Sequence, residues 1–293
     1  LRRSAADRPL FHACSVDRLG IVAAMKLRVA TYNIHKGVMG LRKRSRIHDL
    51  RLALHAIDAD ICFLQEVQER NERLARRPGH HNGTQLDVLC TGSYLHRAYG
   101  MNAVYPHGHH GNAIVSRHAI GQYLNHDISD HVLESRGMLH AISHIETSRG
   151  PLDIHLINTH FGLIKRSRVR QAEFLIDFVR AEVPADAPLI IAGDFNDWQQ
   201  GVDVVLHRDL DVVEAAGDFN RRQQLRRRFD RLLPWRNGDR PLVARTYPSM
   251  LPWFALDRIY VRGFRVRDVR VPRGIEWAQR SDHMPLIADL EVA

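Results

Sequence analysis

The 293-residue sequence predicts a single α+β domain with mixed, mainly antiparallel sheets. Short apolar or alternating runs follow one another through turns along much of the chain, which is typical of antiparallel strands. Two longer segments, residues 47–57 and 165–182, repeat apolar side chains at the spacing of an amphipathic helix. No repeat or linker divides the chain, so we expect one domain over residues 25–293, preceded by a polar arm over residues 1–24.

The first part of the chain combines strands with the first predicted helix. Residues 26–32 alternate polar and apolar side chains, as a sheet strand does, and the helix over residues 47–57 follows. Residues 60–66 form an apolar strand with an acidic end. Residues 70–110 show little pattern, and we expect loops there around one short helix near residues 86–90.

The middle of the chain predicts a strand meander followed by the second helix. We expect strands over residues 111–116, 137–145 and 152–158, paired antiparallel through their short connections. The helix over residues 165–182 places its apolar side chains on one face and Arg166 on the opposite face.

The C-terminal part begins with a buried strand, because the apolar run 189–192 is bounded by Pro188 and Gly193. A short helix and four more strands are expected over residues 198–206, 212–213, 255–261, 264–271 and 284–290. We expect residues 255–261 and 264–271 to pair around a turn at Arg262 and Gly263.

Charge and cysteine content narrow the function classes. The chain has 42 Lys+Arg against 33 Asp+Glu, a net charge of +9 and a pI near 9.9, which favours phosphate-bearing partners or an anionic membrane surface. The arginine-rich stretch 221–240, with Arg226 to Arg228 at its centre, is either a solvated face or a polyanion-binding patch.

Cys14, Cys62 and Cys90 have no metal-type spacing, which argues against a disulfide framework and a structural zinc site. A reducing compartment, the cytoplasm, is therefore expected. No apolar run is long enough to span a membrane, and residues 19–25 lack the features of a signal sequence.

Polar residues follow the apolar strand runs repeatedly, and each such cluster alone could be a polar turn. The clusters contain Asn33, Glu66, His160, Asp194, Asn196, Asp257, Asp282 and His283. A fold that gathered them at one sheet edge would form a pocket with an acidic, metal-binding side and a histidine side.

Glu66 terminates a run too apolar to face solvent, so an unpaired carboxylate there would be costly unless a cation or donor meets it. Mg²⁺, or Mn²⁺, is the expected ion, because no cysteine or paired-histidine motif accompanies this carboxylate. Asp257 and His283 could form a carboxylate–imidazole pair in which the aspartate fixes the tautomer of the ring.

These motifs together resemble the endonuclease/exonuclease/phosphatase superfamily over residue 26 to the C-terminus. The resemblance is carried by Thr31-Tyr-Asn33, Leu64-Gln-Glu66, Gly111-Asn112, Asn158-Thr-His160, Gly193-Asp194-Phe-Asn196, Leu256-Asp257-Arg and Ser281-Asp282-His283, in that order. It implies a four-layer αββα sandwich, two mixed sheets face to face with helices outside, and Mg²⁺-dependent cleavage of a phosphoester.

The resemblance also implies residue roles. Asn33, Glu66 and Asp282 would hold the metal. His160, Asp194, Asn196, Asp257 and His283 would be catalytic, with either Asp194 or His283 as the base. Substrate contacts are expected from His35, Asn112, Arg166 and Arg168.

Two departures from the abasic-site nucleases of the superfamily bear on the substrate, namely His35 and His160. The Asn-Thr-His form is similar to the branch holding sphingomyelinases, deadenylases and tyrosyl-DNA phosphodiesterases. We expect a monomeric phosphodiesterase whose substrate is nucleic acid. The alternatives are a lipid headgroup with peripheral membrane contact, an inositol or sugar phosphate, and an inactive binding protein.

Overall fold

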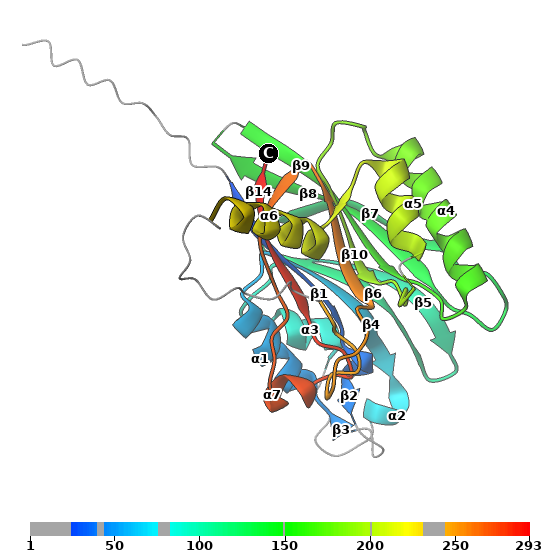
Figure 1. The fold of residues 1–293 in the computed structure, drawn as a ribbon. Coiled ribbons are helices and arrows are strands. Elements are labelled where there is room, and N and C mark those ends of the chain that lie inside the picture. The colour runs from blue at the N-terminus through cyan, green and yellow to red at the C-terminus, as the bar shows by residue number, and fades with distance from the viewer. Residues whose placement is uncertain (1–24, 40–43, 76–82, 149, 200, 231–243) are drawn as a thin grey trace, which may run out of the picture.

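The computed structural model describes residues 25–39, 44–75, 83–148, 150–199, 201–230 and 244–293 (Figure 1). The arm predicted over residues 1–24 lies outside the described residues, as does part of the arginine-rich stretch. Among the described residues, no helix is both long and apolar enough to cross a membrane.

Two six-stranded mixed sheets form the centre of the fold. The first has the order β13 (Phe264–Arg270), β14 (Leu286–Val292), β1 (Lys26–Asn33), β4 (Ile61–Asn71), β6 (Gly108–Ser116) and β5 (His96–Tyr105). The second has the order β11 (Val213–Glu214), β12 (Asp257–Arg262), β10 (Leu189–Asp194), β9 (Gly150–His160), β8 (Gly137–Thr147) and β7 (Ala119–Asp127). A small hairpin joins β2 (Val38–Met39) to β3 (Arg44–Ser45).

The sheets pack face to face, and helices cover their outer faces (Figure 1). The inner core joins Val29 and Phe63 of the first sheet to Leu156 and Ile190 of the second. On the outer face of the first sheet lie α1 (Ile47–Ile57) and α3 (Gln85–Cys90), and on that of the second lie α4 (Lys165–Glu182) and α5 (Gly201–Leu210). The predicted four-layer αββα sandwich is confirmed.

Three further helices complete the described chain. The arginine-bearing α6 (Ala215–Asp230) packs its first residues against the inner core, and α2 (Glu72–Ala75) and α7 (Ile275–Ala278) are short. A single 3₁₀ turn, η1 (His35–Gly37), follows β1.

Strand direction brings distant residues to one edge of both sheets. β1 is parallel to β4 and antiparallel to β14, while β10 is parallel to β9 and antiparallel to β12. Asn33, His160 and Asp194 are therefore the last residues of their strands, and Asp257 is the first residue of β12. Asp194 pairs across the ladders with both Asp257 and His160.

The structure corrects two strand pairings. β12 and β13 lie in different sheets, so residues 255–261 and 264–271 do not form a hairpin. Gly263, at φ +78°, instead turns the chain from one sheet to the other. β6 and β8 also lie in different sheets, so the meander consists of β7, β8 and β9.

Other corrections concern the extent of elements. The region 70–110 contains β5 as well as the expected short helix, and β7 was not predicted. β4 does not end at Glu66 but continues past a bulge to Asn71. α5 begins at Gly201, three residues later than the predicted helix start.

Candidate active site

A cavity of about 430 Å³ opens at the sheet edge where these strand ends meet. Its polar lining comes from both sheets, and its mouth carries apolar and aromatic side chains. The lining residues are Asn33, His35, Glu66, Arg136, His160, Leu163, Asp194, Asn196, Trp198, Tyr247, Phe254, Leu256, Asp282 and His283.

One carboxylate oxygen of Asp194 is the point on which the polar side chains converge. Asn33 donates its amide to Oδ2 at 3.1 Å, while Nε2 of His160 and Nε2 of His283 each lie 3.6 Å from the same oxygen. The other oxygen, Oδ1, accepts the backbone N–H of Asn196 at 3.0 Å. Burial raises the pKa of Asp194 to about 6, although the charge of His283 acts in the opposite direction.

His283 lies between two carboxylates. Its Nδ1 donates to Oδ2 of Asp257 at 2.8 Å, which leaves Nε2 facing Asp194. Burial alone would lower the pKa of His283, but the charges of Asp257 and Asp194 outweigh it and raise the pKa to about 10. The ring of Tyr247 packs against the imidazole with centroids 4.9 Å apart. This ring is therefore held as a charged donor in a fixed orientation.

His160 is held as a neutral donor by Arg136. NH1 of Arg136 lies 3.4 Å from Nδ1 of His160, and a guanidinium can only donate, so Nδ1 is the acceptor. The ring proton then resides on Nε2, which faces Asp194. Complete burial lowers the pKa of His160 well below its ordinary value, and the charge of Arg136 adds to this effect.

Glu66 projects into the cavity from the bulge in β4. Its backbone is left-handed, with φ of +56°, an uncommon conformation for a residue other than glycine, asparagine or aspartate. Oε2 is buried without a hydrogen-bond partner among the described residues, and its nearest cation is Nζ of Lys36 at 3.5 Å. The fold thus keeps inside the cavity a carboxylate oxygen that accepts no hydrogen bond from the described residues and has only the ion pair with Lys36, and a bound cation would compensate it further.

The η1 turn brings His35 to the opposite wall. His35, Lys36 and Gly37 all have positive φ, and a Cβ on Gly37 would lie 2.6 Å from Nε2 of Gln85. Nδ1 of His35 contacts Oδ2 of Asp282 at 3.1 Å, and this hydrogen bond raises the pKa of His35. Burial alone would raise the pKa of Asp282, but His35 and the charge of His283 lower it.

Two groups of residues could hold a metal ion. Ligand atoms of Asp194, Asp257 and His283 all lie within 4.8 Å of one another. However, Asp257 and His283 already use one atom each in their mutual hydrogen bond, so this group is a hydrogen-bonded cluster rather than a set of free metal ligands. Glu66, with its unpaired oxygen, shares the cavity with Asn33 and Asp282, and this all-oxygen donor set fits a hard divalent cation.

Four of the predicted site residues do not line the cavity. Asp257 lies behind His283, and Asn112 is buried with its amide donating to the carbonyl of Gly137 at 2.8 Å. Arg166 is exposed on α4. Arg168, predicted to contact substrate, is only 1% exposed, because its guanidinium packs under the mouth of the cavity and donates to the carbonyl of Leu163 at 2.6 Å.

Arg136 and the apolar and aromatic side chains that line the cavity were not identified from the sequence. Arg136 immediately precedes β8, whose pairing with β9 places it beside His160. The sequence signal available for Arg136 was its position directly before the strand that precedes the Asn-Thr-His strand. Leu163, Trp198, Tyr247 and Phe254 come from loops and carried no such signal.

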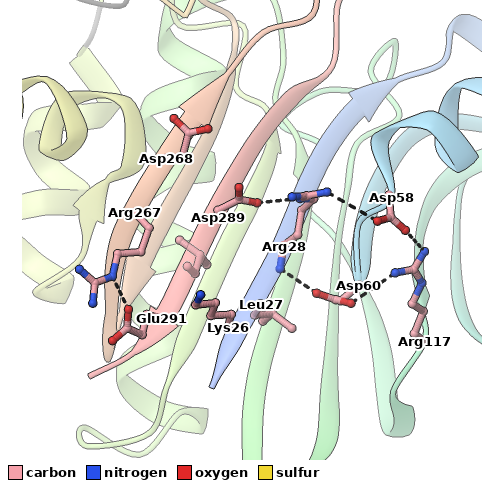
Figure 2. Close-up of a pocket in the computed structure, with 11 residues that line it drawn as sticks. Lys26, Leu27, Arg28, Asp58, Asp60, Arg117, Arg267, Asp268, Asp289 and Glu291 are labelled. Atoms are coloured by element: carbon pink, nitrogen blue, oxygen red, sulfur yellow. Dashed lines mark hydrogen bonds and ion pairs between the residues drawn. The ribbon is translucent and has the colours of Figure 1, made fainter. Parts of the chain in front are cut away.

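A second and larger cavity, of about 630 Å³, lies where β1 begins and β14 ends, at the opposite end of the first sheet from Asn33 (Figure 2). Most of its charged residues, though not Lys26, are joined in ion pairs. Arg28 bridges Asp289 and Asp58, Arg117 bridges Asp58 and Asp60, and Arg267 contacts Glu291. This network leaves little charge for a ligand.

Comparisons with known proteins agree with the fold. The sequence model described as the Endonuclease/Exonuclease/phosphatase family matches residues 30–283. YbhP of Escherichia coli K12, described as an uncharacterized protein, is 35% identical over 269 residues, which cover 90% of this chain and 96% of YbhP.

Two solved structures share the architecture at low sequence identity. The endonuclease/exonuclease/phosphatase from Bacteroides vulgatus is 17% identical with a TM-score of 0.66, and the match covers 92% of this chain and 100% of that one. The human nocturnin catalytic domain, solved with a bound sulfate anion, is 19% identical with a TM-score of 0.62, covering 92% and 94%. At these identities the likeness concerns the fold.

Proposed function

The chain belongs to the Endonuclease/Exonuclease/phosphatase family, and from this premise we propose that it is a divalent-cation-dependent phosphodiesterase. One observation carries the proposal. Asn33, His160 and His283 converge on a single oxygen of Asp194, in the same cavity that holds the carboxylate oxygen of Glu66 without a hydrogen-bond partner among the described residues. A base, two N–H donors and an oxygen-rich cation site are the parts that hydrolysis of a phosphoester requires.

Glu66, Asn33 and Asp282 are the proposed ligands. Bound there, Mg²⁺ or Mn²⁺ would supply Lewis-acid stabilisation of the negative charge that develops on the phosphoryl oxygens.

Asp194 is the proposed base. Its carboxylate takes a proton from water, the water oxygen forms a bond to phosphorus, and the bond from phosphorus to the leaving oxygen breaks. The leaving alkoxide takes up, through solvent, the proton that Asp194 removed from water, so the carboxylate is regenerated and the products are a phosphomonoester and an alcohol. Asn196 keeps Asp194 oriented through its backbone N–H, and its amide is itself fixed to the carbonyl of Phe161 at 2.9 Å.

The two histidines act as donors. His283, flanked by the carboxylates of Asp257 and Asp194, holds its proton and presents Nε2–H to a phosphoryl oxygen. This arrangement favours Asp194 over His283 as the base. His160, with Arg136 behind it, presents a second N–H to the same region. Asp257 is a positioning residue that acts through His283.

The sequence-based preference for a nucleic-acid substrate rests on the net charge of +9. The arginine that lines the cavity, within the described part of the chain, is Arg136. The apolar side chains at the cavity mouth favour the second predicted substrate class, a phospholipid, which is developed below. Nucleic acid remains one arm of the test.

Hydrolysis of bis-p-nitrophenyl phosphate tests the reaction class without assuming a natural substrate. We expect turnover with Mg²⁺ or Mn²⁺, none with EDTA, and loss of at least about 10³-fold in Glu66→Gln. Glu291→Gln, the same chemical change in the larger cavity, is the matched control and should keep wild-type activity. Equal activity of Glu66→Gln and wild type would refute the proposal.

A further inference from the structure

We propose that the mouth of the active-site cavity docks on the surface of an anionic phospholipid membrane and that the substrate is the phosphodiester of a phospholipid. This inference rests on the proposed phosphodiesterase function and names its substrate class. It follows from the side chains that surround the cavity rather than from those inside it.

Large apolar side chains are exposed on three connections around the mouth. We call this set the apolar rim: Val132, Leu133, Leu163, Ile164, Met250, Leu251, Trp253 and Phe254, with Trp198 beside them. Val132 is 100% exposed and Leu133 is 91% exposed. Exposed apolar side chains that cluster at one site mark a surface that is covered in use.

The rim is continuous with the catalytic cavity. A groove of about 350 Å³ shares Arg136 and Leu163 with that cavity, and its lining combines apolar side chains with polar ones: Ala103, His110, His131, Leu133, Glu134, Ser135, Arg136, Leu163 and Ile164. On the other side, Tyr247 and Phe254 line the cavity and pair through their backbones, so Met250 and Leu251 lie at the end of the same short loop. A ligand in the cavity therefore extends onto apolar surface on both sides.

Buried polar groups anchor the exposed tip of one rim loop. Gln171 of α4 donates to the carbonyl of Ile128 at 3.1 Å and to Glu134 at 2.9 Å, and Ser167 donates to Asp130 at 2.9 Å. These bonds fix both sides of the loop that carries Val132. A fixed loop that presents apolar side chains to water is pre-organised for a partner.

Arg168 supports another part of the rim. Its guanidinium lies 4.4 Å from the ring centroid of Trp198 and donates to the carbonyl of Leu163. The buried arginine thereby contacts the ring of Trp198 and fixes the backbone that carries Leu163. This gives a structural role to the residue that was predicted to contact substrate.

The composition of the rim favours a lipid over a single-stranded nucleic acid. Most of its members are aliphatic and offer no aromatic face on which a base can stack, whereas aliphatic side chains with tryptophan and phenylalanine are the usual contacts with a bilayer interface. Lys165 and Arg166 are exposed and directly follow Ile164 in the sequence, and the chain as a whole carries +9. This charge complements anionic headgroups.

Vesicle binding tests the docking surface with the full-length protein. Wild type should co-sediment with vesicles of phosphatidylcholine and phosphatidylglycerol in a 7:3 ratio and bind at least about tenfold more weakly to phosphatidylcholine alone. The double variant Val132→Ser/Leu251→Ser should lose at least about tenfold in binding. Leu95→Ser, at an exposed leucine away from the rim, is the matched control and should bind as wild type does.

Activity on two substrates separates this inference from the proposed function. The double variant should hydrolyse bis-p-nitrophenyl phosphate at the wild-type rate, because neither residue lines the cavity, but should hydrolyse vesicle phospholipid at least about tenfold more slowly. If the wild-type protein hydrolyses neither substrate, the proposed phosphodiesterase function itself is refuted.

Three outcomes would overturn the docking proposal. The first is an unchanged rate of the double variant on vesicles. The second is binding of the rim to a single-stranded oligonucleotide in place of vesicles. The third is that the wild-type protein is a dimer in solution and the double variant is a monomer, which would assign the rim to contacts between copies of the chain.

Discussion

The two cavities of this protein differ in how their charges are compensated. In the larger cavity, each carboxylate of the ion-pair network faces an arginine, with Arg28 2.7 Å from Asp289 and Arg117 3.5 Å from Asp60. In the smaller cavity, Asn33, His160 and His283 surround one oxygen of Asp194, and Oε2 of Glu66 accepts no hydrogen bond from the described residues and has only the ion pair with Lys36. Unsatisfied polar atoms, rather than volume, therefore identify the site.

The pKa of Asp194 shifts in the opposite direction from the pKa values of the acids in the larger cavity. Arg117 lowers the pKa of Asp58 and Arg267 lowers that of Glu291, whereas burial raises the pKa of Asp194 to about 6. Burial also acts to raise the pKa of Asp289, but hydrogen bonds from Arg28 and Arg270 lower it overall. The larger cavity thus stabilises the charged form of its acids, whereas the smaller one does so for Asp282 but disfavours the charged form of Asp194.

The largest expected effect is that a substitution in the smaller cavity lowers activity without lowering stability, whereas one in the larger cavity lowers stability without lowering activity. Asp194→Asn should lower kcat by about 10³-fold or more, since the variant has no base, and should leave the thermal midpoint unchanged or higher. Asp289→Asn should keep kcat within about twofold and lower the thermal midpoint, by about 2–4 °C for each kcal/mol lost. Kinetics and thermal unfolding of the same preparations check both expectations.

The comparison would fail if Asp289→Asn lost activity as Asp194→Asn does while remaining folded. In that case the larger cavity would take part in the reaction.

A smaller effect is expected at the positioning residue Asp257. Asp257→Asn should lower kcat by roughly 10²-fold with little change in KM, because the ring of His283 would lose both its orientation and its charge partner. The alkaline limb of the pH–rate profile should move to lower pH, since Asp257 raises the pKa of His283. A uniform loss without a change in the pH profile would indicate a structural role only.

The smallest expected effect is on stability against acid. Asp289 has a lowered pKa in the folded protein, so its contribution to stability is present above the unfolded value near 4 and is lost as pH falls through the folded value. Denaturant titrations between pH 7 and pH 3 should show a decrease that Asp289→Asn reduces, by about 1 kcal/mol or less for a partly exposed pair. Identical pH dependence in variant and wild type would show that the ion pairs add nothing.

The sequence predicted the polar edge of the sheets because most of the contributing residues lie at or next to a strand end, although Glu66 lies at a bulge inside β4. Asn33, His160 and Asp194 close their own strands, so short motifs were sufficient to find them. The rim and Arg136 could not be found in this way, since the rim residues lie on loops and Arg136 precedes its strand without a motif, although it meets His160 through the pairing of the consecutive strands β8 and β9.

Two strands, β5 and β7, were not predicted from the sequence, and their position in the sheets explains why. β5 and β7 each form one edge of a sheet, opposite β13 and β11, and their side chains are largely exposed or half-buried, which removes the alternating pattern. The hairpin expected around Gly263 was wrong because a glycine turn looks the same whether the chain returns to its own sheet or crosses to the other.

The most direct test of the site is a crystal of the wild-type protein grown with Mn²⁺ and examined by anomalous scattering. We predict one strong peak about 2.0–2.3 Å from Oε2 of Glu66, in the cavity that Asn33 and Asp282 also line. A fully occupied ion held by Asp194, Asp257 and His283, with Glu66 still paired only to Lys36, would contradict the account.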